Sequence, residues 1–222
     1  MAKEYTRSVK VLGPIPALGE LLLHDDFSDI NRWTKTDGGG DDVFRRDIGQ
    51  SLNSLPSLRL KSRTTSADTG DEIGASLGLH LLPSQEVSII WTFLGITWAR
   101  FDTAIFGATW QSGPEDYAVG IRYTHATPAW AYLNSGGTYT NISGMDELLE
   151  DSVWHRLSMS FNFNTSEYIQ TAINHESHTL ADIAIGSTTQ ELDVRFQPTL
   201  SLKTVGANPV EMYVDSVLIH SL

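Results

Sequence analysis

The chain has 222 residues, and its 15 Lys and Arg against 27 Asp and Glu give a net charge of −12 at pH 7. An acidic surface repels phosphate backbones, which argues against nucleic-acid binding. The sequence has no cysteine, so disulfides, thiolate nucleophiles and Cys-ligated metal centres are excluded.

The N-terminal segment differs from the rest of the chain. Residues Gly13–Pro16 read Gly-Pro-Ile-Pro, a stretch that neither continues a helix nor donates to a central β-ladder. We therefore predict an extended N-terminal arm over residues 1–20, which docks on a neighbouring subunit. It is followed by a β-sandwich domain over residues 21–222.

The start of the chain also bears on where the protein is located. Residues 1–7 lead into no apolar segment of signal-peptide type, and no apolar run reaches the roughly 18 residues that cross a bilayer. The sequence predicts no signal peptide and no membrane insertion, with the protein in the cytoplasm or assembled into a particle such as a virion. Secretion stays open if a signal peptide has been trimmed.

From Glu20 onward, short runs of apolar and β-branched residues alternate with polar residues and are separated by Gly, Pro, Asn and Asp. This spacing is typical of an all-β sandwich of two antiparallel sheets. Val87–Trp98 is almost continuously apolar, which predicts a central strand covered on both faces. The other predicted strands are residues 21–24, 58–61, 75–81, 103–110, 117–124, 130–134, 154–163, 168–174, 199–205 and 210–219.

One short helix is predicted at Met145–Asp151. Ser143 stands three residues before Asp146, which is capping-box spacing, and Leu148 and Leu149 supply a small apolar face. Such a helix of one or two turns would connect two strands.

Four segments carry a family resemblance: Leu23–Asp29, Ser57–Ser62, Trp154–Phe163 with its Trp-His-x-Leu start, and Met212–Ile219. In this order they resemble the concanavalin A-like jelly-roll superfamily, which includes legume lectins, laminin G-like modules and many glycan-binding modules. The likeness is greatest to an uncharacterised bacterial jelly-roll family (domain of unknown function 6772), whose members end on a similar Tyr-Val-Asp-Ser-Val strand. The resemblance implies the fold, and the family has no settled activity to carry over.

Signatures of catalysis on this architecture are missing from the sequence. Glycan hydrolases of this type carry two carboxylates at alternate positions of one strand, because acid and nucleophile flank a glycosidic bond about 5 Å apart. The corresponding Glu-x-Asp-x-x-Glu pattern does not occur. Gly74–Gly78 matches the G-x-S-x-G nucleophile elbow, but Ser76 stands in mid-strand with no helix after it. We therefore predict a protein that is not an enzyme; a hydrolase or lyase would need groups such as Arg122, Arg156 and His80 to converge.

Two acids are predicted metal ligands by resemblance. Jelly-roll modules often hold one structural Ca²⁺ near the meeting point of the first and last strands, where Asp26 and Asp215 would be the side chains concerned. The alternative is that Asp26 caps the turn to Asp29 while Asp215 accepts from neighbouring amides. No cofactor is required in either case. His175–His178 lacks a regular face for zinc and is interpreted as a solvated turn.

Aromatic side chains are the main candidates for ligand binding, since the C–H face of a sugar packs on a ring and its hydroxyls need planar polar partners. Trp110 ends a predicted strand, and Trp130 and Tyr132 alternate with small residues, so that their rings share one face. We predict that this face is exposed. The tryptophans in core contexts are Trp33, Trp91 and Trp154.

Arg122 and Arg156 place charged groups in mid-strand, on what is predicted to be the same ligand face. A second interpretation, without a bound ligand, has an equally sound physical basis. Polar residues on the solvated side of an antiparallel sheet need no ligand, and exposed rings also mark protein interfaces.

Two functions remain after these exclusions. The first is a non-catalytic glycan-binding module in multivalent display, because a shallow site with a Kd near ~1 mM supplies only about −4 kcal/mol. The second is a structural or decoration protein of a larger assembly such as a phage virion, with the arm docking on a neighbour. The predicted partners are glycans, protein subunits or both, and the protein is expected to be a homo-oligomer or multivalent.

Overall fold

The computed structural model describes residues 20–36, 42–53, 55–63, 70–79, 86–112, 115–188, 196–206 and 208–222. Within these ranges the chain forms sixteen β-strands and two short 3-10 helices, η1 (Ile30–Arg32) and η2 (Trp98–Arg100). No helix of this described part is long and apolar enough to cross a membrane. Residues 1–19 lie outside the described residues, so the predicted arm stays a prediction.

The strands form two antiparallel sheets of eight strands each, which we call sheet A and sheet B. Sheet A has the order β13 (Glu176–Ala184), β12 (Glu167–Ile173), β11 (Trp154–Asn162), β6 (Glu86–Gly95), β16 (Glu211–Ser221), β4 (Ser57–Lys61), β3 (Val43–Asp47), with β1 (Leu21–Asp25) paired to β16. Sheet B has the order β10 (Tyr139–Asn141), β9 (Ala129–Leu133), β8 (Glu115–Thr124), β7 (Phe101–Ser112), β15 (Phe196–Thr204), β5 (Glu72–Leu77), β2 (Trp33–Thr36), with β14 (Gly186–Thr188) paired to β8. The predicted all-β sandwich is confirmed.

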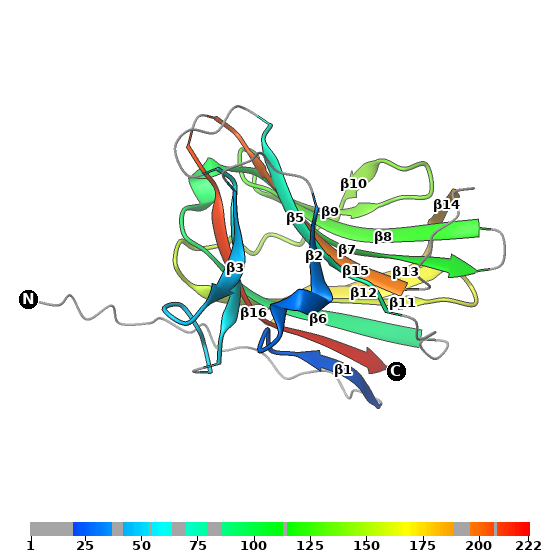
Figure 1. Cartoon of the computed structure of the whole chain (residues 1–222). Coiled ribbons are helices and arrows are strands. Elements are labelled where there is room, and N and C mark those ends of the chain that lie inside the picture. Colours follow the sequence, from blue (N-terminus) through cyan, green and yellow to red (C-terminus); the bar gives the residue numbers. More distant parts are fainter. Residues whose placement is uncertain are drawn as a thin grey trace, which may run out of the picture.

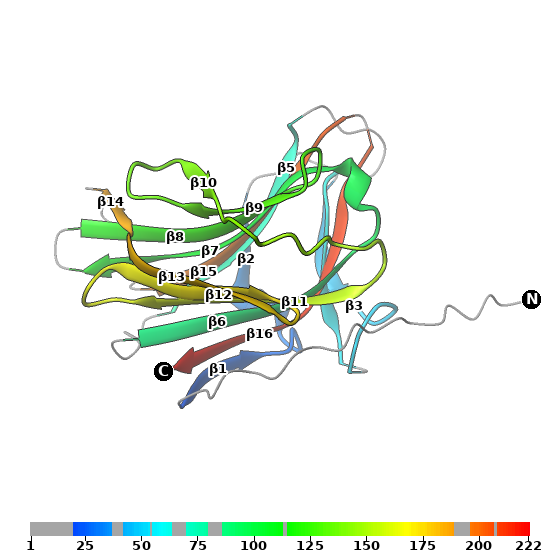
Figure 2. The same cartoon turned by 180° about the vertical axis from the view of Figure 1, so that it is seen from behind.

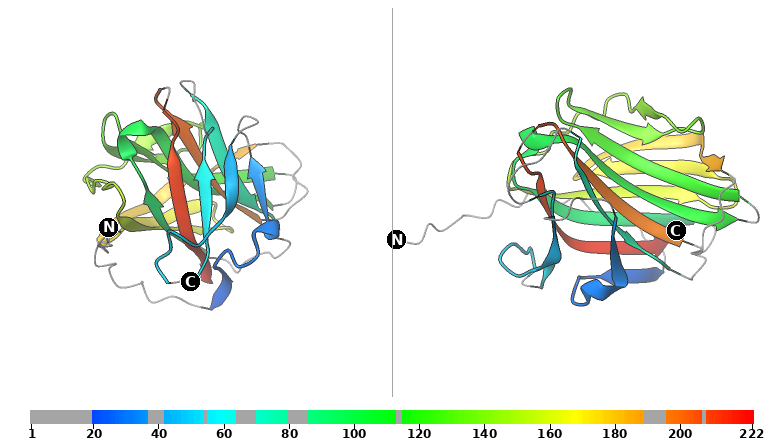
Figure 3. Two further views of the ribbon diagram at one scale, coloured as in Figure 1. Left: turned by 60° about the vertical axis from the view of Figure 1, so that its left-hand side comes forward. Right: turned by 45° about the horizontal axis from the view of Figure 1, so that its top comes forward.

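The two sheets lie face to face as two layers. Figure 1 shows β7, β8 and β9 of sheet B above β6, β11 and β12 of sheet A, and Figure 2 shows the same layers from behind. In the right-hand view of Figure 3, the green β7 and β8 and the orange β15 present the outer face of sheet B. Each sheet therefore has an inner face, packed on the other sheet, and an outer face.

Alternation along the strands decides which residues enter the core. Along β15, buried and partly exposed residues alternate through all nine positions. Phe196, Leu200 and Leu202 point inward and are at most 3% exposed, whereas Thr199 and Ser201 lie on the outer face. Because the side-chain period of a strand is two, a shift by one residue would bury the hydroxyls and expose the apolar set.

The central strand of sheet A matches its sequence prediction. β6 pairs with β11 on one side and β16 on the other, and every residue after Glu86 is buried. Trp91 and Phe93 point inward, where their rings meet Phe106 of sheet B at centroid distances of 5.7 and 4.6 Å. Burial of large rings from both sheets is the main favourable contribution to holding the layers together.

The predicted helix at Met145–Asp151 is wrong. Residues 145–150 have no helical structure, because side chains of sheet A take up their backbone amides. The Glu176 carboxylate accepts from the amides of Asp146 and Glu147 at 3.3 and 3.0 Å, and His155 Nε2 accepts from the amide of Glu150 at 3.1 Å. These bonds replace the capping box that the sequence indicates.

The G-x-S-x-G match at Gly74–Gly78 is a coincidence, as predicted from the sequence. Ser76 lies within β5, paired with Thr199 of β15 and Thr34 of β2, and is 2% exposed. A nucleophile elbow needs an exposed serine between a strand and a helix. This serine is part of an uninterrupted sheet.

His220 gives the fold a dependence on pH. It is 9% exposed in β16, neither ring nitrogen has a hydrogen-bond partner among the described residues, and burial lowers its pKa. Since the unfolded chain then binds a proton more readily, the folded state loses stability as pH falls through the unfolded value of about 6.5. We expect His220→Leu to flatten this loss in urea titrations between pH 8 and 5. The exposed His175→Gln variant should keep the wild-type slope, and parallel curves for all three proteins would contradict the assignment.

Candidate functional site

Two of the predicted ligand-binding residues belong to the core. Trp110 and Trp130 are each 1% exposed. Trp110 stacks on Tyr117 and on Phe161 of sheet A at 5.2 and 5.3 Å, and Trp130 Nε1 donates to the Glu147 carbonyl at 2.8 Å. The prediction that the Trp130 ring is exposed is wrong, because this ring lies between the two sheets.

Tyr132 shares the inner face with Trp130, as the alternation predicts. Its ring is partly buried and meets Tyr168 of sheet A edge-on, with centroids 5.9 Å apart. The small neighbours of these rings, Ala131 and Leu133, therefore occupy the outer face. Sequence alternation identified the two sets correctly and assigned them to the wrong sides.

The two predicted arginines lie on opposite sides of the sandwich. Arg122 is on the outer face of sheet B, opposite Ile105 and Ala131 in the neighbouring strands. Arg156 is on the outer face of sheet A, opposite Thr92 of β6. The predicted single ligand face that combines both arginines is therefore wrong, and His80, the third group considered, lies outside the described residues.

Two glycines face each other at the centre of sheet B, and both are buried. Gly107 of β7 is paired with Gly120 of β8. A Cβ atom added to Gly107 would come within 2.6 Å of the Val119 carbonyl, and one added to Gly120 would come within 3.1 Å of the Tyr139 hydroxyl. Glycine allows this close packing, and we call the Gly107–Gly120 pair the glycine floor.

Arg122 and Tyr139 stand beside the glycine floor. The Arg122 guanidinium carbon lies 4.3 Å from the centroid of the Tyr139 ring, which is cation–π geometry. Tyr139 reaches this position from β10, where it is opposite Leu133. The sequence analysis did not identify Tyr139. The signal that could have found it is the turn at Gly136 and Gly137, which predicts a hairpin that returns Tyr139 alongside β9.

The opposite side of the face is polar. The Ser201 hydroxyl of β15 donates to a carboxylate oxygen of Glu72 in β5. Burial raises the pKa of Tyr139 most strongly; Arg122 lowers it and Glu72 raises it. Glu72 of β5 and Arg122 of β8 thus shift the pKa of Tyr139 in opposite directions.

A tyrosine of sheet A fixes the glycine floor from beneath. The Tyr168 hydroxyl accepts from the Gly120 amide and donates to the Leu133 carbonyl, both at 2.9 Å. The β8–β9 pairing ends at Ile121 and Tyr132, so the hydroxyl bridges the two strands where their ladder stops. Burial raises the pKa of Tyr168, which keeps the hydroxyl protonated as a donor.

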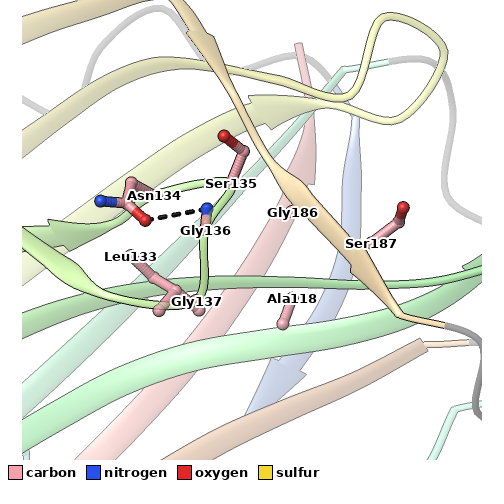
Figure 4. Close-up of a pocket in the computed structure, with 8 residues that line it drawn as sticks. All are labelled: Ala118, Leu133, Asn134, Ser135, Gly136, Gly137, Gly186 and Ser187. Atoms are coloured by element: carbon pink, nitrogen blue, oxygen red, sulfur yellow. Dashed lines mark hydrogen bonds between the residues drawn. The ribbon is translucent and has the colours of Figure 1, made fainter.

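A small cavity of about 240 Å³ adjoins the same face (Figure 4). Ala118, two residues from Gly120 on β8, lies at its base, and the turn after β9 forms one wall. The Asn134 carboxamide oxygen accepts from the amides of Gly136 and Thr138 at 2.9 and 3.1 Å and shapes this turn. The remaining lining residues are Leu133, Ser135, Gly137, Gly186 and Ser187, so the cavity offers backbone and hydroxyl groups without charge.

The predicted calcium ligands are engaged by other groups. Asp26 accepts from the Ser28 amide at 3.0 Å, a bond that lowers the pKa of Asp26. Asp215 accepts from the Leu52 amide and the Asn53 carboxamide, and burial raises its pKa. Among the described residues no group of three side chains suited to a metal comes together. A Ca²⁺ site stays an untested prediction of the resemblance.

Comparison with known proteins bears on the fold. No protein-family model and no curated protein matches the chain. The alginate lyase vAL-1 from a Chlorella virus superposes with a TM-score of 0.61 at 10% identity, over 91% of this chain and 100% of that one. The T. cruzi calreticulin globular domain gives 0.57 at 10% identity, over 91% and 89%. The carbohydrate recognition domain of Emp46p in its potassium-bound form gives 0.51 at 10% identity, over 88% and 91%.

At such identities the likeness concerns the fold, because side chains at corresponding positions differ almost everywhere. The resemblance to the uncharacterised bacterial family stays a prediction. The paired eight-stranded antiparallel sheets and the superposed structures together make this chain a β-sandwich of the concanavalin A-like jelly-roll type.

Proposed function

We propose that this protein binds carbohydrate on the outer face of sheet B, over the glycine floor. The observation that carries the proposal is the cation–π pair of Arg122 and Tyr139, both partly exposed, beside the glycine floor. A sugar ring needs a flat surface for its C–H face and fixed polar groups at its edge. For the first we propose the partly exposed Ala118 and Leu133, which line the adjoining cavity. The arginine, the tyrosine hydroxyl and Ser201 supply the second.

The proposed site is open and shallow, which favours weak binding. A Kd near ~1 mM corresponds to about −4 kcal/mol, and useful adhesion then requires several copies acting together. Multivalent display of the sandwich is therefore part of the proposal. The solved structures with the same fold include a carbohydrate recognition domain and a polysaccharide lyase, which is compatible with a glycan ligand.

We propose binding without bond cleavage. In the described part of the outer face, Glu72 is the carboxylate that acts on Tyr139, and it already accepts a hydrogen bond from Ser201. A hydrolase pair needs two carboxylates in defined positions across a glycosidic bond. The second candidate of the sequence, a structural or decoration protein, depends on residues 1–19 and stays a prediction.

A glycan array with purified protein tests the proposal. We expect Tyr139→Ala to reduce retention on the glycans that the wild type binds by about tenfold, because an aromatic contact is worth roughly 1–1.5 kcal/mol. Thr179→Ala, at an exposed position of β13 in the other sheet, is the matched control and should bind like the wild type. Absence of any bound glycan, or equal binding by Tyr139→Ala, would refute the proposal.

A further inference from the structure

The hydrogen-bond donors of Arg122 indicate which class of sugar the proposed site would bind. A guanidinium carries five N–H donors, and Arg122 is only partly exposed. No residue of the described chain forms a hydrogen bond or ion pair with it, and its Nε–H is buried. Its protein contact is the face of the Tyr139 ring.

Two other arginines of the chain are paired with carboxylates. Arg59 lies 2.7 Å from Glu211, and Arg32 lies 3.5 Å from Asp25. In a chain with a net charge of −12, acidic partners are abundant. A partly buried arginine whose Nε–H has lost water without gaining a partner costs solvation free energy, and an anion bound at the guanidinium would offset part of it.

We propose that the sugar bound at this face is acidic and that its carboxylate pairs with Arg122. This inference rests on the proposed function, since it assigns the ligand class of the same site. The Tyr139 ring contacts the guanidinium at 4.3 Å, and no described residue bonds to its N–H groups. A carboxylate could therefore pair with the guanidinium through two parallel hydrogen bonds.

The neighbours of Arg122 on the outer face are small, and the acid on this face lies away from it. Its cross-strand neighbour in β9 is Ala131, and Gly120 is two residues away on the same side of β8. On the far side of the floor stands Glu72, which repels an anion and, with Ser201, suits sugar hydroxyls. The carboxylate is therefore directed to the Arg122 end, with hydroxyls toward β15 and β5.

The test compares acidic oligosaccharides with their neutral counterparts. The probes are trisaccharides that contain galacturonate, glucuronate or sialate, each alongside its carboxyl-reduced form, titrated by calorimetry in ~0.15 M salt, where the Debye length of about 8 Å limits long-range repulsion. We expect at least one acid form to bind about tenfold more tightly than its reduced form, since a charge-assisted hydrogen bond contributes roughly 1.5 kcal/mol or more. Arg122→Gln should abolish this preference, and Arg122→Lys should keep part of it.

Arg156→Gln is the matched control, because Arg156 also has a buried Nε–H without a partner in the described structure but lies on the opposite face. It should retain the full preference. Melting curves of Arg122→Gln should match the wild type, since no hydrogen bond to the chain is lost. Equal binding of acidic and reduced forms, or an unchanged preference in Arg122→Gln, would overturn this inference alone. Failure of all probes and of the neutral glycans of the array would overturn the proposed function with it.

Discussion

Replacing Tyr168 with phenylalanine is expected to lower the free energy of unfolding by about 2–4 kcal/mol, since each buried polar group left without a partner costs roughly 1–3 kcal/mol. The lost hydroxyl serves the Gly120 amide and the Leu133 carbonyl across a break in the β8–β9 ladder. Urea unfolding followed by tryptophan fluorescence measures the change. The ring itself stays in place, so the effect isolates the two hydrogen bonds.

The matched control is Tyr132→Phe. Its ring packs edge-on against Tyr168, and its hydroxyl has no hydrogen bond within the described residues, so we expect a change below about 1 kcal/mol. Gly120 lies next to the Tyr139 hydroxyl. Tyr168→Phe, which removes the hydrogen bond to the Gly120 amide, should therefore also weaken glycan binding, whereas Tyr132→Phe should not. Equal losses of stability in the two variants would show that the hydroxyl bridge is not what holds β8 and β9 together here.

Asp25→Ala is expected to have the other large effect, a loss of about 3–5 kcal/mol, the usual cost of breaking a buried charge arrangement. Asp25 is 4% exposed at the end of β1. One carboxylate oxygen accepts from the Phe27 amide at 2.9 Å, and the other accepts from Trp33 Nε1 at 3.1 Å and lies 3.5 Å from Arg32.

Backbone strain adds to the role of Asp25. Phe27 has φ of 55°, in the left-handed region that non-glycine residues rarely adopt, and it is fully buried against Trp33. The bond from the Phe27 amide to Asp25 holds this conformation, and its loss lets the turn relax and withdraw a large ring from the core. We expect the calorimetric melting point to fall by roughly 6–20 °C, since ~1 kcal/mol corresponds to roughly 2–4 °C in a domain of this size.

Asp26→Ala provides the contrast for Asp25→Ala. Its carboxylate accepts one amide hydrogen bond, from Ser28, on the exposed side of the same turn, so we expect a loss of about 1 kcal/mol or less. Asp25→Asn keeps one acceptor and should fall between the two alanine variants. A loss of similar size in Asp25→Ala and Asp26→Ala would mean that the turn, and not the buried carboxylate, is the stabilising feature.

Local patterns were sufficient to predict the sandwich and the position of its central strand. Period-two alternation reports which residues share a face, and a continuous apolar run reports burial on both faces, since both follow from the geometry of a single strand. The prediction of a helix at residues 145–151 was wrong because Glu176 and His155, which lie on other elements, accept hydrogen bonds from the backbone amides of this segment. No local propensity can include amide bonds offered by a distant strand.

The sequence by itself determined that the protein is an acidic, cysteine-free β-sandwich with Trp33, Trp91 and Trp154 in its core. Only the tertiary structure decided which face of each strand is covered by the opposite sheet. That choice places Trp110 and Trp130 inside, puts Arg122 and Arg156 on opposite sides, and brings Tyr139 and Glu72 to one surface. Alternation separates the two faces of a strand but does not tell which of them is buried. The pairing of strands that are distant in sequence decides which face meets the other sheet.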